Sequence, residues 1–103
     1  MTLQDIKERC DELGLKYQYG FFEDNTEPPY LVGVIGDSNN FKADNVVYKK
    51  VDTVDLYYTY KVKDLTIEEK IEDELLADVV WRKNEETYYV DEEVWQVIYT
   101  FNI

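Results

Sequence analysis

Histidine is absent from this chain, and cysteine occurs once, as Cys10. Without histidine the chain lacks the commonest general base and the Ser-His and Cys-His arrangements of nucleophilic catalysis. One cysteine allows no disulfide within the chain, and the cysteine and histidine patterns of zinc sites are missing. We expect Cys10 to be a small buried hydrophobe on the inner face of a helix.

Basic residues are also scarce, because 11 Lys and Arg face 23 Asp and Glu, for a formal charge of -12. Binding to a nucleic-acid backbone over the whole surface is therefore disfavoured, since phosphate affinity comes from clustered Lys and Arg. Three roles remain for the acidic surface: solvation, contact with a basic partner, or repulsion of DNA that must pass without sticking.

Long apolar runs and a leader-like first segment are lacking. We expect a soluble protein made in a reducing compartment, with no membrane partner. Glycine-rich nucleotide-binding fingerprints are missing. The loop with Asp37, Asn39 and Asp44 is not an EF-hand, which needs glycine at Lys42 and glutamate at Tyr48. The sequence therefore predicts no catalytic residue, no cofactor, no metal site and no enzymatic activity.

Tyrosine is abundant, with ten in the chain beside four Phe. Tyr is enriched at protein interfaces, where it offers a large contact area and a polar tip. It also suits β-strands for packing reasons alone. Both explanations stay open at this point.

The first helix is predicted between Leu3 and Leu13. Thr2 and Asp5 form a capped start, and Gly14 is suited to the left-handed position after the helix. Its apolar stripe consists of Leu3, Ile6, Cys10 and Leu13.

A second, charged helix is predicted between Lys63 and Lys83, with Thr66 and Glu69 in capping-box positions. Apolar residues recur at every fourth position on its inner face, and Leu76 and Val80 widen this face. The opposite face is acidic and is either a solvated surface or one that meets a basic partner or DNA: Glu68, Glu69, Glu72, Asp73 and Asp78.

Alternating apolar residues predict two strands in this part of the chain, the first followed by a loop and the second by a turn. The first strand runs from Leu15 to about Phe22 and ends in a loop. The second, Tyr30 to Ile35, is apolar on both sides and so is central or covered on both faces, with Gly33 at a bulge or a close approach. The cluster from Gly36 to Asn40 predicts a turn.

The third strand region has its core face at alternate positions, Val54, Leu56, Tyr58 and Tyr60. The segment from Val46 to Val51 also alternates, but Val51 and Val54 are three apart. The inner face must therefore switch at a bulge, bend or turn near residues 52 and 53. Tyr57, on the other side, belongs either to an exposed mixed face or to a subunit contact.

The last third of the chain predicts short strands and one long one. Trp81 closes the second helix or begins a strand, and Tyr88 to Val90 form a brief strand between two turns. The final strand, from Val94, places five large residues inward and belongs inside the sheet: Trp95, Val97, Tyr99, Phe101 and Ile103. We therefore predict one α+β domain over residues 1–103, with order α-β-β-β-α-β plus short hairpin strands, one mixed or antiparallel sheet, and both helices on one face.

From Tyr17 onward the chain resembles the small tail-component proteins of siphophages and prophages of Gram-positive bacteria. The resemblance is carried by a Pro-Pro strand, a Phe-Ala-Asn loop, a Leu-Tyr strand end, a charged helix and a Tyr-rich last strand. In this sequence these are Pro28 to Ile35, Phe41 to Asn45, Leu56 to Tyr57, Thr66 to Val80 and Val94 to Phe101. Lys42 departs from the pattern, where glycine is expected before the alanine.

The resemblance implies a tail-terminator or tail-completion protein, which forms a homo-oligomeric ring at the head-proximal end of the tail tube and joins tail to head. Its partners would be the major tail protein and head-completion or connector proteins, and DNA would pass without specific binding. It would be found in the host cytoplasm during assembly and then in the virion tail. The alternatives are another head-tail connector component and an acidic DNA mimic that inhibits a nucleic-acid-binding enzyme.

Three of the eleven basic residues fall between Phe41 and Val51, on an otherwise acidic chain. This segment is therefore our candidate for gripping the acidic face of a neighbouring subunit, and together with Tyr57 it gives the predicted interface. The interface residues are Phe41, Lys42, Tyr48, Lys49, Lys50 and Tyr57.

Overall fold

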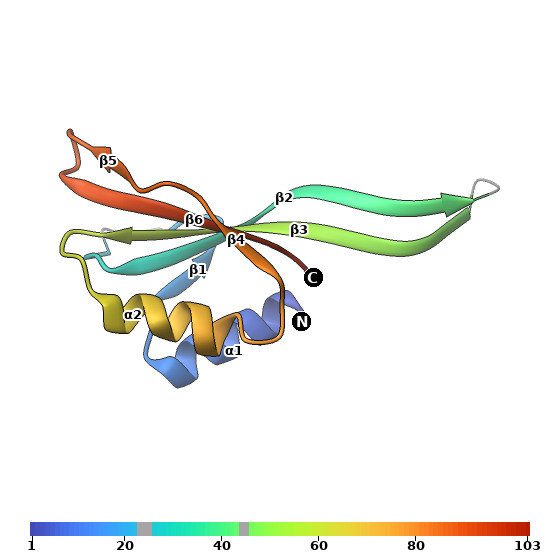
Figure 1. Cartoon of the computed structure of the whole chain (residues 1–103), viewed down its shortest axis with the longest axis horizontal. Coiled ribbons are helices and arrows are strands. Elements are labelled where there is room, and N and C mark those ends of the chain that lie inside the picture. The colour runs from blue at the N-terminus through green and yellow to red at the C-terminus, as the bar shows by residue number, and fades with distance from the viewer. Residues whose placement is uncertain (23–25, 44–45) are drawn as a thin grey trace.

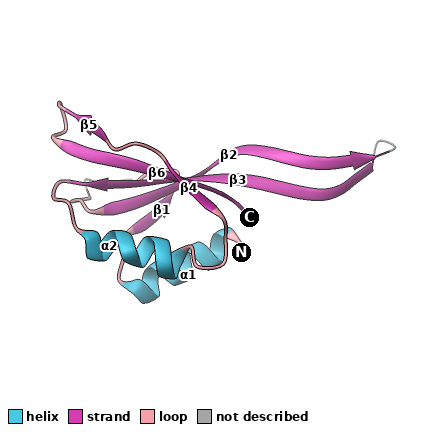
Figure 2. Ribbon diagram, in the orientation of Figure 1, coloured by secondary structure: helices cyan, strands magenta, loops and turns pink. Residues whose placement is uncertain are grey.

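The computed structural model describes residues 1–103 except 23–25 and 44–45, and leaves the side chains of 37–51 undescribed. A six-stranded mixed sheet carries the helical segments on one face (Figures 1 and 2). The strands are ordered β1-β2-β3-β6-β4, with β5 also paired to β6. Only β1 and β2 run parallel among these pairs. The predicted α+β class, with both helical segments on one face, is confirmed.

The elements follow the predicted order, with two short extra strands after the second helix. They are α1 (Leu3–Leu13), β1 (Tyr17–Tyr19), β2 (Tyr30–Ala43), β3 (Val46–Tyr60), α2 (Leu65–Glu69), the π-helical segment η1 (Lys70–Leu75), β4 (Trp81–Lys83), β5 (Thr87–Tyr89) and β6 (Val94–Asn102). β1 is shorter than predicted, and Trp81 begins a strand instead of closing the helix.

The helix α1 begins and ends where the sequence predicts. Thr2 and Asp5 form a reciprocal capping box, and Gly14 takes the left-handed conformation with φ 72°. The amide of Leu15 then donates to the carbonyl of Cys10 at 2.9 Å. Cys10 is buried, as expected.

The predicted turn from Gly36 to Asn40 is wrong, because β2 continues through it to Ala43. Residues of turn-forming type can still pair through their backbones, and here they face β3 across a two-stranded ribbon. The register shifts between Ile35 and Asp37, so Gly36 is the extra residue of a β-bulge. The irregularity predicted for residues 52 and 53 therefore lies on the facing strand, and β3 itself continues from Val51 to Val54 without an extra residue.

The second helix differs from its prediction in start, width and end. Asp64 is the cap and accepts from the amide of Thr66 at 2.9 Å, so Thr66 is not the cap. After Glu69 the chain changes to a π-helix, in which the amide of Leu76 donates to the carbonyl of Ile71 at 2.9 Å. Val80 lies beyond it and is 94% exposed.

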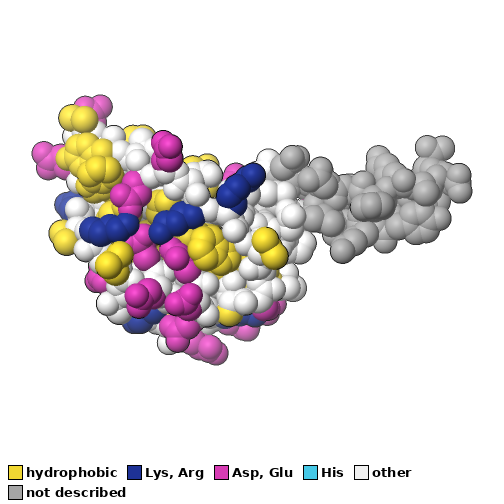
Figure 3. All heavy atoms as spheres, viewed as in Figure 1, with side chains coloured by type: hydrophobic (Ala, Val, Ile, Leu, Met, Phe, Trp, Pro, Cys, Tyr) yellow, Lys and Arg dark blue, Asp and Glu magenta, His cyan; other side chains and the backbone are white. Residues whose placement is uncertain are grey.

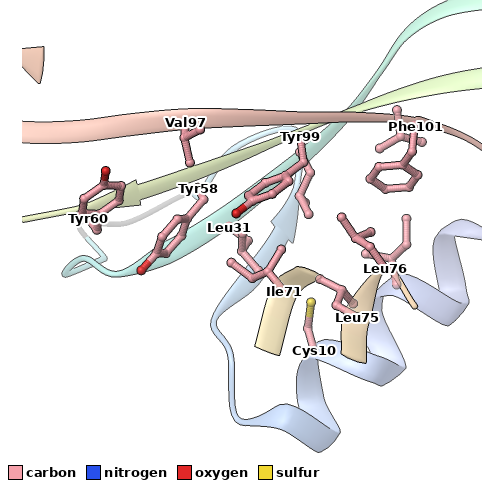
Figure 4. Packing of buried hydrophobic residues seen from close by; sticks show 13 residues of the cluster. Cys10, Leu31, Tyr58, Tyr60, Ile71, Leu75, Leu76, Val97, Tyr99 and Phe101 are labelled. Carbon is pink, nitrogen blue, oxygen red and sulfur yellow. The ribbon is translucent and has the colours of Figure 1, made fainter. Parts of the chain in front are cut away.

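The core lies between the sheet and the helical layer (Figure 4). Its buried apolar residues are Ile6, Cys10, Leu31, Val54, Leu56, Tyr58, Tyr60, Ile71, Leu75, Leu76, Val97, Tyr99 and Phe101. The predicted inner faces of β3 and β6 are therefore confirmed, and β6 lies inside the sheet between β3 and the pair β4 and β5. Trp95 is the exception on β6, since it is 38% exposed.

Gly33 is the close approach that the sequence predicts for β2. A Cβ atom added there would lie 2.8 Å from the hydroxyl oxygen of Tyr17. β2 is also interior in the sheet, between β1 and β3. The glycine therefore leaves room for the hydroxyl end of the Tyr17 ring against the strand.

Candidate functional site

An arm extends from the body of the molecule, formed by the second part of β2 and the first part of β3 (Figure 1). We use this name for residues 36–43 and 46–53. The two strands pair from Asp37 opposite Thr53 to Ala43 opposite Val46. The helices lie under the body and do not reach the arm (Figure 2). A two-stranded ribbon is marginally stable by itself.

Gly36 marks the base of the arm. A Cβ atom at this position would lie 2.4 Å from Oδ2 of Asp55. The Asp55 carboxylate is held in place, since its Oδ1 accepts from the Thr100 hydroxyl at 2.9 Å. A side chain at Gly36 would therefore disturb the contact between β3 and β6, next to the bulge from which the arm starts.

The predicted interface residues are divided between the arm and the body. Phe41 pairs with Lys49 and Asn40 with Lys50 across the arm, and Lys42 with Val47. The side chains of five predicted interface residues lie outside the described part of the structure: Phe41, Lys42, Tyr48, Lys49 and Lys50. Tyr57 belongs to the body, where it is half-buried on the sheet face away from the helices and pairs with Val32 and Ile98.

The predicted acidic face is not one exposed surface. Glu68 is only 3% exposed and lies between two lysines, with Lys63 Nζ at 2.9 Å from Oε2 and Lys83 Nζ at 2.8 Å from Oε1. Lys63 also pairs with Glu86. A nearly buried carboxylate is stable here because two ammonium groups compensate it. The prediction of an outward Glu68 is therefore wrong.

Glu72 joins the same network from η1. Its Oε2 accepts from Lys83 Nζ at 2.7 Å and from the Tyr99 hydroxyl at 2.6 Å. Burial alone would raise the pKa of Glu72, but these two hydrogen bonds hold it below its usual value. Burial and the hydrogen bond to Glu72 raise the pKa of Tyr99 far above its usual value. Lys83 Nζ also lies 5.5 Å from the centre of the Tyr99 ring.

Asp78 is engaged with the first helix. Arg9 holds both of its carboxylate oxygens, at 2.6 and 3.0 Å, and also donates to the carbonyl of Leu75 at 3.0 Å. The hydrogen bonds from Arg9 lower the pKa of Asp78 to about 2. Of the five predicted acidic residues, Glu69 and Asp73 are exposed without a described ion pair, and the other three take part in internal contacts.

Cys10 does not supply a reactive thiol. It is completely buried, and burial raises the pKa of its thiol to about 12, so the nucleophilic thiolate is scarce at neutral pH. Within the described ranges no group of three potential ligands could hold a metal ion. None of the described helices is long and apolar enough to cross a membrane.

An exposed aromatic pair on the β5–β6 hairpin was missed by the sequence interpretation. Tyr88 and Trp95 are cross-strand partners, with ring centroids 5.0 Å apart. Tyr88 is 45% and Val90 74% exposed. The signal was present as two Tyr and a Val directly before the acidic turn of residues 91–93. Strand alternation correctly predicted the face of the sheet on which Trp95 lies, but it did not reveal that the helical layer leaves Trp95 uncovered.

The chain matches no protein-family model, and no curated protein is similar enough in sequence to count as a relative.

The ion network predicts a loss of stability in acid. A carboxylate whose pKa is lower in the folded state stabilises the fold at any pH above its unfolded pKa, and this contribution is lost as the pH falls through the folded pKa. The pKa of Glu72 and of Glu86 is 4.5 in the unfolded chain and lower in the folded protein. We expect the melting temperature to fall progressively below about pH 4.5, at roughly 4–8 °C for each kcal/mol lost.

Circular dichroism melts between pH 7 and pH 3 measure this effect. Glu72→Gln should melt lower at pH 7 and show a shallower acid dependence than the unaltered chain. Asp73→Asn, which removes an exposed carboxylate from the same segment, should leave the dependence of melting temperature on pH unchanged. An equal fall in melting temperature with pH in all three proteins would show that the network does not control stability in acid.

Proposed function

We propose that this chain is a non-enzymatic structural protein of phage or prophage virions, a tail-terminator or tail-completion protein. It forms a ring at the head-proximal end of the tail tube and joins the tail to the head. The observation that carries the proposal is the arm, a paired ribbon whose faces are not covered by the helices of its own chain. Such a ribbon gains stability when a neighbouring subunit packs against it.

The charge distribution supports assembly through the arm. The arm and its connecting residues contain three Lys, balanced by Asp37, Asp44 and Asp52, so the rest of the chain carries the whole formal charge of -12. A neutral arm with three ammonium groups can approach an acidic body that would repel another body. The acidic surface left over would repel DNA and let it pass through the ring.

The position of the arm supports a ring more than a simple dimer. The molecule measures 50 × 29 × 26 Å, and the arm lies at one end of the long axis (Figure 1). An arm that binds a surface of the next subunit other than that subunit's own arm makes a heterologous interface. Repetition of that interface gives a ring where the rotation closes.

The decisive test combines size in solution with binding to tail tubes. Sedimentation of the purified chain over a range of concentrations should reveal oligomers larger than dimers, and negative-stain images should show the chain at one end of isolated tail tubes. A chain that stays monomeric or dimeric, does not bind tail tubes and inhibits a basic nucleic-acid-binding enzyme would instead be the acidic DNA mimic.

Reversing charge on the arm should weaken assembly without unfolding the body. We expect Lys49→Glu with Lys50→Glu to raise the concentration needed for assembly at least about tenfold, the equivalent of 1.4 kcal/mol. The melting temperature should change by only a few degrees, because surface substitutions usually have small effects.

The matched control is Lys7→Glu with Arg82→Glu, an equal charge change at exposed positions of the body. Sedimentation measures assembly, and circular dichroism measures folding. Equal assembly by both double variants and the unaltered chain would remove Lys49 and Lys50 from the interface.

A further inference from the structure

The arm requires an acceptor surface on the neighbouring subunit, and the helical segment is poorly suited to supply it. Three of the five residues predicted for its acidic face already have internal partners, namely Glu68 and Glu72 with the two lysines and Asp78 with Arg9. An acceptor for a neutral arm that carries apolar residues and three lysines should instead combine exposed aromatic area with acidic groups. The β5–β6 hairpin has both.

The aromatic part of this hairpin is large and accessible. Trp95 and Tyr88 form a cross-strand pair with ring centroids 5.0 Å apart, and Val90 lies beyond them at the tip. All three are exposed. Figure 3 shows hydrophobic side chains gathered at this end of the molecule with acidic side chains around them. Trp and Tyr are the residue types that most often dominate binding energy at protein interfaces.

The acidic part surrounds the aromatic pair in the sequence. The stretch 84–96 contains no basic residue and five carboxylates: Glu85, Glu86, Asp91, Glu92 and Glu93. Glu86 is engaged with Lys63, whereas the three acids of the turn lie at the exposed tip. This charge complements the three lysines of the arm.

The two surfaces cannot meet within one chain. The arm and the β5–β6 hairpin lie at opposite ends of the molecule, whose longest extent is 50 Å (Figure 1). A contact between them therefore joins two copies, arm to hairpin, and leaves a free arm and a free hairpin for the next copies. This is the heterologous, repeating contact that a ring requires.

We propose that the β5–β6 hairpin, with Tyr88 and Trp95 at its centre, is the surface on which the arm of a second copy docks. The aromatic pair packs against apolar residues of that arm, and the carboxylates of the hairpin turn face its lysines. The inference rests on the ring-forming function proposed above and adds the acceptor surface to it.

Cysteine cross-linking tests this contact directly. Lys49→Cys places a thiol on the arm and Val90→Cys places one on the hairpin tip, while the buried Cys10 stays unreactive. A mild oxidant should produce mixed disulfide dimers when the two variants are combined, in clear excess over either variant alone. One chain with both substitutions should give a ladder of covalent trimers and larger species, which a symmetric dimer cannot form.

The matched control replaces the hairpin position with an exposed one at the opposite edge of the sheet. Gln18→Cys lies on β1 and should give no mixed product with Lys49→Cys above the background of random collision. Mixed products of equal yield from positions 18 and 90 would overturn the assignment of the hairpin.

Removing the aromatic centre tests how much it contributes to the free energy of assembly. Trp95→Ala should raise the concentration needed for assembly at least about tenfold, as expected for a central interface aromatic. Tyr19→Ala, which removes an aromatic side chain that is 47% exposed on β1 at the opposite edge of the sheet, should assemble normally. Circular dichroism of both variants establishes that they are folded.

The outcomes separate the docking surface from the function on which it rests. If the unaltered chain forms rings while Trp95→Ala assembles normally and positions 49 and 90 do not cross-link, the docking surface is wrong and the ring stands. If the unaltered chain stays monomeric even with tail tubes, both proposals fall. If the cross-linked ladder forms but no tail tube is bound, the docking surface holds and the tail function fails.

Discussion

A chain that ends at Thr100 should lose most of its stability. The deletion removes Phe101, which is 2% exposed and pairs with Val54 on one side and Trp81 on the other. Truncating a buried Phe costs about 3–5 kcal/mol, a large share of the roughly 5–15 kcal/mol that holds an ordinary domain together. We expect the melting temperature to fall by more than about 12 °C, at roughly 4 °C or more per kcal/mol.

The other two deleted residues add hydrogen bonds at the base of the arm. The amide of Ile103 donates to the carbonyl of Asp52 at 2.9 Å, and the side chain of Asn102 accepts from the Thr53 hydroxyl at 2.9 Å. Their loss should loosen the start of the arm as well as the core. Thermal melts followed by circular dichroism measure the first effect, and amide exchange at residues 52–54 measures the second.

Deletion of Ile103 alone is the matched control. It keeps Phe101 in the core and should lower the melting temperature by much less than the three-residue deletion. A chain ending at Thr100 that melts within a few degrees of the unaltered chain would show that the end of β6 is not needed for the core.

Periodicity predicted the parts of the fold in which one face is buried. In α1 the stripe and both ends were correct, and in β3 and β6 the inner faces were correct, because a single buried side repeats with the period of the backbone. The arm has no helix on either side, so no burial pattern could distinguish a strand from a turn between Gly36 and Asn40. Composition then favoured a turn that the structure does not contain.

The candidate site was harder to predict than the fold because it depends on distant partners. Glu68 is inward because Lys83, fifteen residues later, lies beside it, and a helical wheel carries no information about that neighbour. Trp95 is exposed because the helical layer does not extend as far as its end of the sheet. Both errors concern what lies opposite a side chain, whereas the sequence pattern reports only the direction in which the side chain points.

Replacing Tyr99 with Ala should be among the most damaging single substitutions in this chain, and replacing Tyr57 should be mild. Tyr99 is fully buried, donates to Glu72 at 2.6 Å and packs edge-on against Trp81 with ring centroids 5.6 Å apart. Tyr57 is half-buried on the uncovered sheet face. We expect Tyr99→Ala to cost about 3–5 kcal/mol, as large-to-small core substitutions do.

Tyr99→Phe separates the ring of Tyr99 from its hydroxyl. It keeps the packing against Trp81 and removes only the hydrogen bond to a charged group, which is worth about 1.5–3 kcal/mol. The stability of the three variants, measured by urea unfolding, should therefore rank Tyr57→Ala above Tyr99→Phe and Tyr99→Ala last. If Tyr57→Ala is the least stable of the three, the inner and outer faces of β3 and β6 have been assigned the wrong way round. If Tyr57→Ala keeps its stability but assembles poorly, Tyr57 joins the arm and the β5–β6 hairpin as part of the surface between subunits.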